Sequence, residues 1–167
     1  MIALIEPNER YLRSYKEAYQ EYMASGVSTY GMTDAGACNI FEKYDNYRNA
    51  RNLKPDRVGS DFYWLVDDEK DYFIGEVAVR HRLNDTLLLR GGHIGYVIRC
   101  SAWGKGYGTR MLKLALEKAK QRGISRVLIT CNDSNLASAR VMEKNGLVLE
   151  NIVNVDGILT RRYWKQL

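Results

Sequence analysis

Residues 92–123 read GHIGYVIRCSAWGKGYGTRMLKLALEKAKQRG, and this stretch sets the order of the elements around it. Its first eight residues are rich in β-branched and aromatic side chains, which is typical of a strand. Three glycines then stand at alternate positions, Gly104, Gly106 and Gly108. After them, apolar residues recur with the period of a helix, and Gly123 is expected to end it as a C-terminal cap. The stretch therefore predicts a strand, a glycine-rich loop and a helix in succession.

The glycine-rich loop, residues 101–110, predicts a binding site for an anion. A loop that leaves a strand and enters a helix exposes free backbone N–H groups where the helix dipole is positive. Glycines let the backbone adopt positive φ and let a ligand come close without a Cβ in the way. The loop is not a P-loop, because Gly106 follows Lys105 where Ser or Thr is needed, and it does not complete the dinucleotide fingerprint. A pyrophosphate group suits such a loop.

The charge of the chain is concentrated around this loop. The protein carries a net charge of +5, but residues 99–126 alone carry +7, so the remainder sums to −2. Such a field favours a polyanionic or phosphorylated ligand. Nucleic acid is the least favoured of these, because the sequence has neither a recognition-helix motif nor a clear aromatic stacking platform.

The rest of the chain is expected to alternate between helices and strands. Helices are predicted over residues 8–26, 38–52 and 135–146, and strands over residues 62–68, 71–83, 125–131, 149–155 and 158–165. The strand–helix–strand unit from 92 to 131 implies a right-handed crossover between parallel neighbours. The turn Asp156-Gly157 predicts an antiparallel hairpin. Together these patterns predict an α/β (α+β) fold, with a mixed sheet covered by helices.

Length and composition favour one domain over residues 1–167, without linkers or repeats. The apolar runs are too short to span a bilayer and the N-terminus lacks the basic region of a signal peptide, so we expect a cytoplasmic location and no membrane partner. Three separated cysteines, Cys38, Cys100 and Cys131, argue against a disulfide framework. Only two histidines are present, which leaves too few ligands for a zinc site.

Residues 93–151 resemble the acetyl-coenzyme A core of the GNAT N-acetyltransferases. Gly106 and Gly108 hold the two small positions of the family loop, Arg/Gln-x-x-Gly-x-Gly/Ala. Asn135 opens the next helix as Asn-Leu-Ala-Ser, and Asn145-Gly146 ends it as in that family. The resemblance implies a twisted, mostly antiparallel sheet of six to seven strands with helices on both faces. It also implies a cofactor core at about 92–150 and a helical substrate-side segment at about 8–60.

The same resemblance implies acetyl-coenzyme A as cosubstrate. Its pyrophosphate would bind the backbone amides of residues 103–108, and its pantetheine arm would lie in a gap between the strand ending at Ile98 and the strand 127–131. A backbone N–H near Tyr96 or Val97 would polarise the thioester carbonyl. Arg110 is a further candidate for the outer phosphates. The expected cofactor-binding residues are Tyr96, Val97, Ile98, Trp103, Gly104, Lys105, Gly106, Tyr107, Gly108, Thr109, Asn135 and Arg140.

The implied reaction is transfer of an acetyl group to a primary amine by direct attack in a ternary complex. A lysine-type amine, with a pKa near ~10.4, must first lose its proton, so a base is expected. His93 stands where the family often has Glu, and Glu76 on the neighbouring strand is the rival base. Met142 stands at the family's usual Tyr, so the acid is unassigned, with Tyr163 or Tyr107 as candidates. These departures leave open a non-catalytic coenzyme A-binding module on the same fold.

The acceptor amine, a small molecule or a peptide, is expected across the sheet from the cofactor, bounded by residues 27–60 and the C-terminal hairpin. Candidate lining residues are Tyr30, Tyr44 and Asp45, and Asp34 or Asp61 is a candidate partner for a cationic amine. An exposed hairpin edge would suit a homodimer contact.

Overall fold

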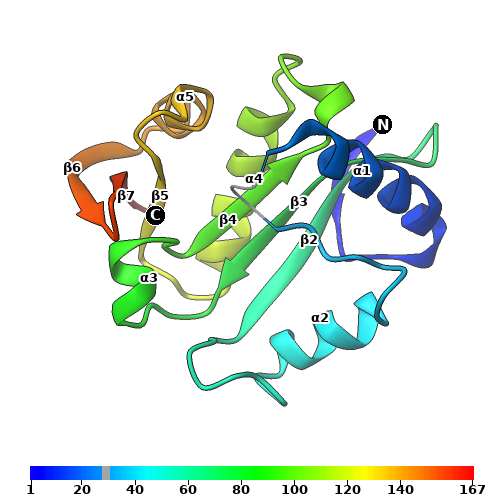
Figure 1. The fold of residues 1–167 in the computed structure, drawn as a ribbon, viewed down its shortest axis with the longest axis horizontal. Helices are drawn as coiled ribbons and strands as arrows, with labels where there is room; N and C mark the ends of the chain where they lie inside the picture. The colour runs from blue at the N-terminus through cyan, green and yellow to red at the C-terminus, as the bar shows by residue number, and fades with distance from the viewer. Residues whose placement is uncertain (28–30) are drawn as a thin grey trace.

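A computed structural model describes residues 1–27 and 31–167 of the chain (Figure 1). Its strands are β1 (Ile2–Ile5), β2 (Ser60–Asp67), β3 (Tyr72–Arg80), β4 (Ile94–Ile98), β5 (Arg126–Asn132), β6 (Val148–Val155) and β7 (Ile158–Gln166). Its α-helices are α1 (Leu12–Ser25), α2 (Ile40–Arg48), α3 (Asp85–Leu89), α4 (Tyr107–Gln121) and α5 (Leu136–Lys144). Two short 3₁₀ turns, η1 (Glu9–Tyr11) and η2 (Cys100–Ala102), precede α1 and the glycine-rich loop. The predicted α/β fold class is confirmed.

The strands form two antiparallel sheets. The first has the order β1-β2-β3-β4 and the second the order β5-β7-β6. Within the described residues, a single bridge between Gly92 and Ile129 joins the sheets, together with the bond from His93 N–H to Leu128 O at 2.7 Å. The pattern-based expectation that strands 92–99 and 125–131 are parallel neighbours in one sheet is therefore wrong, whereas the gap between them that the family resemblance implies is observed. Figure 1 shows β4 and β5 diverging from that joint.

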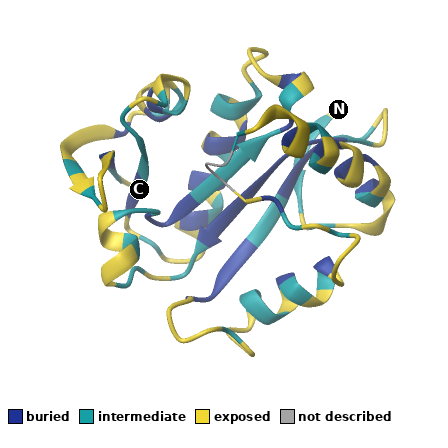
Figure 2. Ribbon diagram, viewed as in Figure 1, coloured by how far each residue is buried: buried dark blue, intermediate teal, exposed yellow. Residues whose placement is uncertain are grey.

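Two hydrophobic cores cover the faces of the four-stranded sheet. On one face, α4 packs its buried residues on Val77 and Ile94 of the first sheet and on Val127 and Ile129 of the second. One helix thus holds both sheets, because its apolar stripe spans the joint between them. Figure 2 shows β3, an inner strand of the first sheet, almost wholly in the buried colour. Helices on both faces were predicted, and they are observed.

The opposite core is largely aromatic and lies beneath α1 and α2. The ring of Tyr15 stacks on that of Trp64 at 4.8 Å, and Tyr44 stacks on Phe62 at 4.6 Å. Phe73 completes the cluster edge-on to Tyr15. Tyr11, Tyr15 and Tyr22 of the first helical segment are therefore core residues.

Local signals fix the ends of several elements. Gly26, in the left-handed conformation with φ +71°, ends α1. The side chain of Asn135 accepts a bond from Ser138 N–H and begins α5, as the sequence predicts. Asp156 and Gly157 have φ +50° and +83°, which suits a tight hairpin turn between β6 and β7. None of the helices in the described ranges combines the length and the apolar character needed to cross a bilayer.

Candidate active site between two sheets

The loop before α4 presents a row of backbone donors. Gly104 and Gly106 adopt φ +74° and +80°, and Gly106 is the N-cap of α4 without a capping side chain. Within residues 1–27 and 31–167, no protein acceptor pairs with the N–H groups of residues 104–109. These groups lie at the positive end of a helix dipole, which is the environment that binds phosphate.

Gly108 has a different role from the other two glycines. It lies inside α4, and its φ is not positive, so the expectation of positive φ at all three glycines is wrong here. A Cβ on Gly108 would lie 3.3 Å from Cγ2 of Val141 on α5. The missing side chain therefore allows α4 and α5 to pack closely beside the loop.

Polar side chains around the loop are used to fasten it. Trp103 Nε1 donates to Ile98 O at 2.8 Å, and Lys105 Nζ donates to Ser101 O at 2.9 Å. Arg110 donates to Ile2 O at 2.7 Å and so ties α4 to the first strand. Arg140 is exposed on α5. The loop therefore offers main-chain groups to a ligand, with Arg140 as the exposed cation nearby on α5.

A cavity of about 130 Å³ lies where β4 and β5 diverge. The side chains that shape it come from both sheets and from α5. They include Arg80, Arg90, Tyr96, Cys131, Asn135 and Ser138. The predicted residues Tyr96 and Asn135 are thus brought together in one cavity. Val97 and Ile98 pack instead into the aromatic core and the α4 core respectively.

The predicted base His93 lies at the joint of the two sheets and is 8% exposed. Its backbone N–H donates to Leu128 O, while its Nδ1 accepts the N–H of the same residue at 3.0 Å. Burial and the charge of Arg80 lower the pKa of His93, so the ring is neutral. Because Nδ1 is an acceptor, the proton is on Nε2, and the lone pair that a base would use is already bonded.

The other predicted base, Glu76, is 1% exposed within the aromatic core. Its Oε2 accepts bonds from the Tyr44 hydroxyl and from Trp64 Nε1, the latter at 3.0 Å. Burial and the charge of Glu76 raise the pKa of both Tyr44 and Tyr15. Glu76 does not line the cavity between β4 and β5. The structure thus places Glu76 in the aromatic core and His93 at the joint between the two sheets, each with its own hydrogen-bond partners.

Two hydroxyl groups in the cavity were not singled out from the sequence. The Tyr96 hydroxyl and Ser138 Oγ lie 2.7 Å apart. Burial raises the pKa of Tyr96 to about 12, so its hydroxyl keeps its proton at neutral pH. In the sequence, Ser138 stands out only as the last residue of the Asn-Leu-Ala-Ser helix start. In the structure its Oγ faces the Tyr96 hydroxyl of β4.

The other candidate proton donors lie outside the cavity, whereas the thiol of Cys131 lines it. Met142 is fully buried in the α4 core, and Tyr163 donates to Glu143 at 2.9 Å away from the cavity. Tyr107 is the first residue of α4 and packs against the same core. Burial raises the pKa of Cys131 to about 11, which holds it as a thiol.

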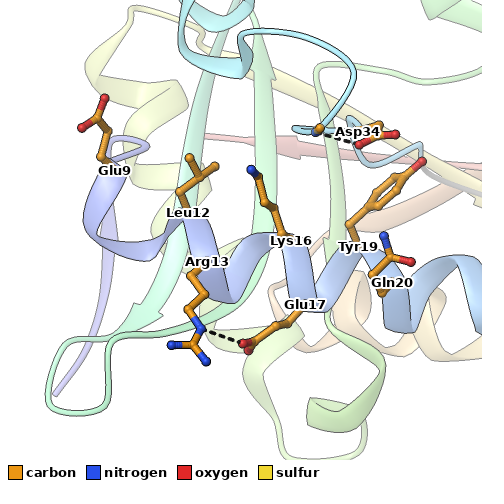
Figure 3. Close-up of a pocket in the computed structure, with 9 residues that line it drawn as sticks. Glu9, Leu12, Arg13, Lys16, Glu17, Tyr19, Gln20 and Asp34 are labelled. Carbon is orange, nitrogen blue, oxygen red and sulfur yellow. Dashed lines mark hydrogen bonds and ion pairs between the residues drawn. The ribbon is translucent and has the colours of Figure 1, made fainter.

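The residues suggested for the acceptor side do not gather at one place. Asp45 pairs with Arg51, and Asp61 pairs with Arg122 at 2.8 Å. Asp34 accepts from Gly36 N–H and lines a second, more open cavity of about 670 Å³ on the outer side of α1 (Figure 3). Tyr44 is buried in the aromatic core, and Tyr30 lies outside the described residues.

Comparison with known proteins was made for the whole chain. The family model for the acetyltransferase (GNAT) domain matches residues 9–148. A search of curated proteins finds no significant match. Many solved structures match the fold of this chain.

Three solved structures illustrate the likeness. The ribosomal L7/L12 alpha-N-protein acetyltransferase RimL, in complex with coenzyme A, superposes with a TM-score of 0.73 at 16% identity, covering 99% of this chain and 94% of its own. The microcin C7 self-immunity acetyltransferase MccE, in complex with acetyl-CoA and AMP, gives 0.72 at 15%, covering 99% and 92%. A GNAT-family acetyltransferase from Bacillus anthracis gives 0.68 at 16%, covering 99% and 94%. Since the family model spans most of the sequence, this chain belongs to the GNAT acetyltransferase family, whose enzymes use acetyl-CoA as cosubstrate.

Proposed function

We propose that the protein is an N-acetyltransferase that transfers the acetyl group of acetyl-CoA to a primary amine by direct attack in a ternary complex. The observation that carries this proposal is the row of N–H groups without a protein acceptor at residues 104–109, in a described chain that also has a cavity between two diverging strands. The name of RimL, which describes alpha-N acetylation of a ribosomal protein, supports an amine as acceptor.

The residues of this chain fit the parts of the cosubstrate in order. The amides of residues 104–109 would hold the diphosphate at the start of α4. Arg140, exposed on α5, remains the candidate for an outer phosphate. Asn135 and the β4 main chain near Tyr96 or Val97 would line the pantetheine and polarise the thioester carbonyl. Acetyl-CoA supplies the activated acyl group.

Proton transfer is proposed to need no dedicated side-chain base. Two arginines, Arg80 and Arg90, line the cavity, and like charges disfavour the ammonium form of an entering amine. The amine would then lose its proton to water. The Tyr96 hydroxyl, which faces Ser138, would donate to the departing thiolate. His93 is proposed to position β4 against β5 instead of acting as a base.

A non-catalytic coenzyme A-binding module is the second candidate. One observation favours it: both residues predicted as bases are buried and already hydrogen-bonded. The module would bind acetyl-CoA without consuming it.

Calorimetry and turnover together test the two candidates. Titration of acetyl-CoA into the full chain is expected to release heat with a 1:1 stoichiometry, and a panel of primary amines is expected to include at least one that is acetylated. Binding without turnover on any amine would support the module. No binding at all would refute both.

We also propose that the protein forms a homodimer through the edge strand β6. Large apolar side chains are exposed along the β6–β7 hairpin: Val148, Leu149, Ile152, Ile158 and Leu159. Such an edge invites pairing with a second strand. Sedimentation should show a dimer that Ile152→Glu converts to a monomer, and a monomeric wild type would end this proposal.

A further inference from the structure

The closed end of the cavity between β4 and β5 is flanked by two arginines from different elements. Arg80 is the last residue of β3 and donates to Gly91 O at 3.1 Å and Gly92 O at 3.0 Å. Arg90 follows α3 and donates to Asn132 Oδ1 at 3.1 Å, across the end of β5. These contacts link the end of β3, the loop before β4 and the end of β5. They hold both guanidinium groups at the lining of the same cavity.

The charge of this space is one-sided. Within the described chain, every residue that lines the cavity is an arginine, a neutral polar residue or an apolar residue, and none is a carboxylate. Arg90 donates to the neutral side-chain amide of Asn132, which takes one of the five N–H donors of the guanidinium. The Arg80 charge also contributes to lowering the pKa of nearby His93. An anionic group would therefore be favoured here.

The aspartates suggested for recognition of a cationic amine are elsewhere. Asp61 is bound to Arg122, and Asp34 lies on the outer side of α1. The side chains that line the cavity include two arginines and are therefore suited to a negatively charged group. Resting on the proposed function, we propose that Arg80 and Arg90 form a subsite for a carboxylate carried by one of the two reactants.

The size of the cavity limits what carries that carboxylate. A volume of about 130 Å³ is close to the ~150 Å³ that accommodates benzene, so it admits roughly six non-hydrogen atoms. A volume of this size has room for a carboxylate and the few atoms that join it to an amine or to an acyl carbonyl. The acceptor is accordingly a compound with a free carboxylate close to its amine. A dicarboxylic acyl chain on the coenzyme offers the same chemistry from the other reactant.

Binding to the full chain saturated with coenzyme A tests the subsite without depending on turnover. N-acetylglycine carries the carboxylate of such a product, and N-acetylglycinamide replaces it with a neutral amide. Calorimetry is expected to show the acid binding at least about tenfold more tightly, the effect of one charged hydrogen bond. A parallel titration compares succinyl-CoA with acetyl-CoA on the free protein.

Variants of Arg90 assign the effect, because Arg90 makes fewer contacts to the backbone than Arg80. Arg90→Gln should abolish the preference for the acid, and Arg90→Lys should retain part of it. Arg57→Gln, in an exposed loop beside Asp56, is the matched control and should behave as wild type. Thermal melts confirm that each variant folds, and if Arg90→Gln does not fold, Arg90→Lys should still show a reduced preference for the acid, whereas an unchanged preference would count against the subsite.

The outcomes separate the two proposals. A preference for N-acetylglycine that Arg90→Gln removes supports a carboxylate on the acceptor. A preference for succinyl-CoA that is lost in the same variant supports a carboxylate on the acyl group. Equal affinities in both comparisons, with coenzyme A bound normally, would overturn the subsite alone. Failure of coenzyme A to bind would overturn the proposed function, and N-acetylglycine titrated into the free protein would still decide the subsite.

Discussion

His93 bonds to both main-chain groups of Leu128: its N–H donates to Leu128 O at 2.7 Å, and its Nδ1 accepts Leu128 N–H at 3.0 Å. The His93 side chain thereby takes the place of the backbone acceptor that a neighbouring strand would offer to Leu128 N–H. A Cβ on neighbouring Gly92 would lie 2.3 Å from Leu128 O, so the joint also needs a glycine. The point at which the two sheets meet is defined by these residues.

This relationship predicts the effect of replacing His93. In His93→Asn, Oδ1 takes the place of Nδ1 and continues to accept Leu128 N–H, so stability and turnover should stay near wild type. In His93→Leu the backbone N–H of Leu128 loses its acceptor and stays buried. The free energy of unfolding should therefore fall by about 1–3 kcal/mol. Urea titration and initial rates measure both. Loss of turnover in a stable His93→Asn would mean that the imidazole takes part in the chemistry.

The pKa values of the two histidines predict a loss of stability in mild acid. Burial and the charge of Arg80 lower the pKa of His93, and burial and the charge of Arg122 lower that of His81. The unfolded chain takes up these protons near pH ~6.5, whereas the native chain takes them up only at lower pH. The unfolded state therefore binds more protons below that value. Unfolding free energies at pH 7.5, 6.5 and 5.5 should decrease in that order, with a smaller decrease in His93→Asn.

Gly106→Ala should weaken coenzyme A binding about tenfold, because a Cβ opposes φ +80° and the amides beside it must shift. The strain itself costs about 1 kcal/mol or more. Gly157→Ala is the matched control, since Gly157 has φ +83°, lies in open space like Gly106 and is in the distant β6–β7 turn. Both variants should lose similar stability, and only the first should lose affinity by calorimetry. Equal affinities in the two would place the ligand elsewhere.

Tyr96→Phe removes the hydroxyl paired with Ser138 and should lower kcat about tenfold while leaving the dissociation constant of coenzyme A unchanged. Tyr163→Phe removes a hydroxyl that donates to Glu143 outside the cavity, so its kcat should remain at the wild-type value. Stopped-flow detection of thiol release compares them. Equal rates for the two variants would show that the thiolate departs without help from Tyr96.

Glu76→Leu leaves the Tyr44 hydroxyl and Trp64 Nε1 without their acceptor in a buried core. The free energy of unfolding should fall by about 2 kcal/mol or more. Glu76→Gln retains an acceptor oxygen, so it should lose less stability and keep its turnover. Denaturant unfolding and rate measurements on the pair distinguish a structural carboxylate from a base. A stable, inactive Glu76→Gln would restore Glu76 as a catalytic residue.

The glycine loop and α4 could be predicted because their signals are local. Positive φ at Gly104 and the apolar period from Met111 to Ala119 are properties of neighbouring residues. The separation of β4 from β5 could not be predicted from such local signals. The alternation of apolar and polar side chains along a strand indicates which face is buried, but it does not indicate which strand is the neighbour. The elements β1 and α3, four and five residues long, are too short for a period to emerge.

The hydrogen-bond partner of the His93 ring could not be predicted, for a related reason. Its position in the sequence matches a catalytic one, but the partner of its ring is Leu128, 35 residues away, and only the fold brings the two together. Arg80 and Arg90 were not singled out, since their neighbours in sequence show no sign that they share a cavity.

Gly108 marks a second place at which the packing around the glycine loop is close. The sheets touch at Gly92 and His93, and farther along, the separation of α4 from α5 is limited by Gly108 against Val141. A methyl group at position 108 would require the Val141 side chain to give way by a few tenths of an ångström. The close approach of the two helices that border the glycine loop therefore depends on one absent side chain, and a bulkier residue there is expected to disturb this border.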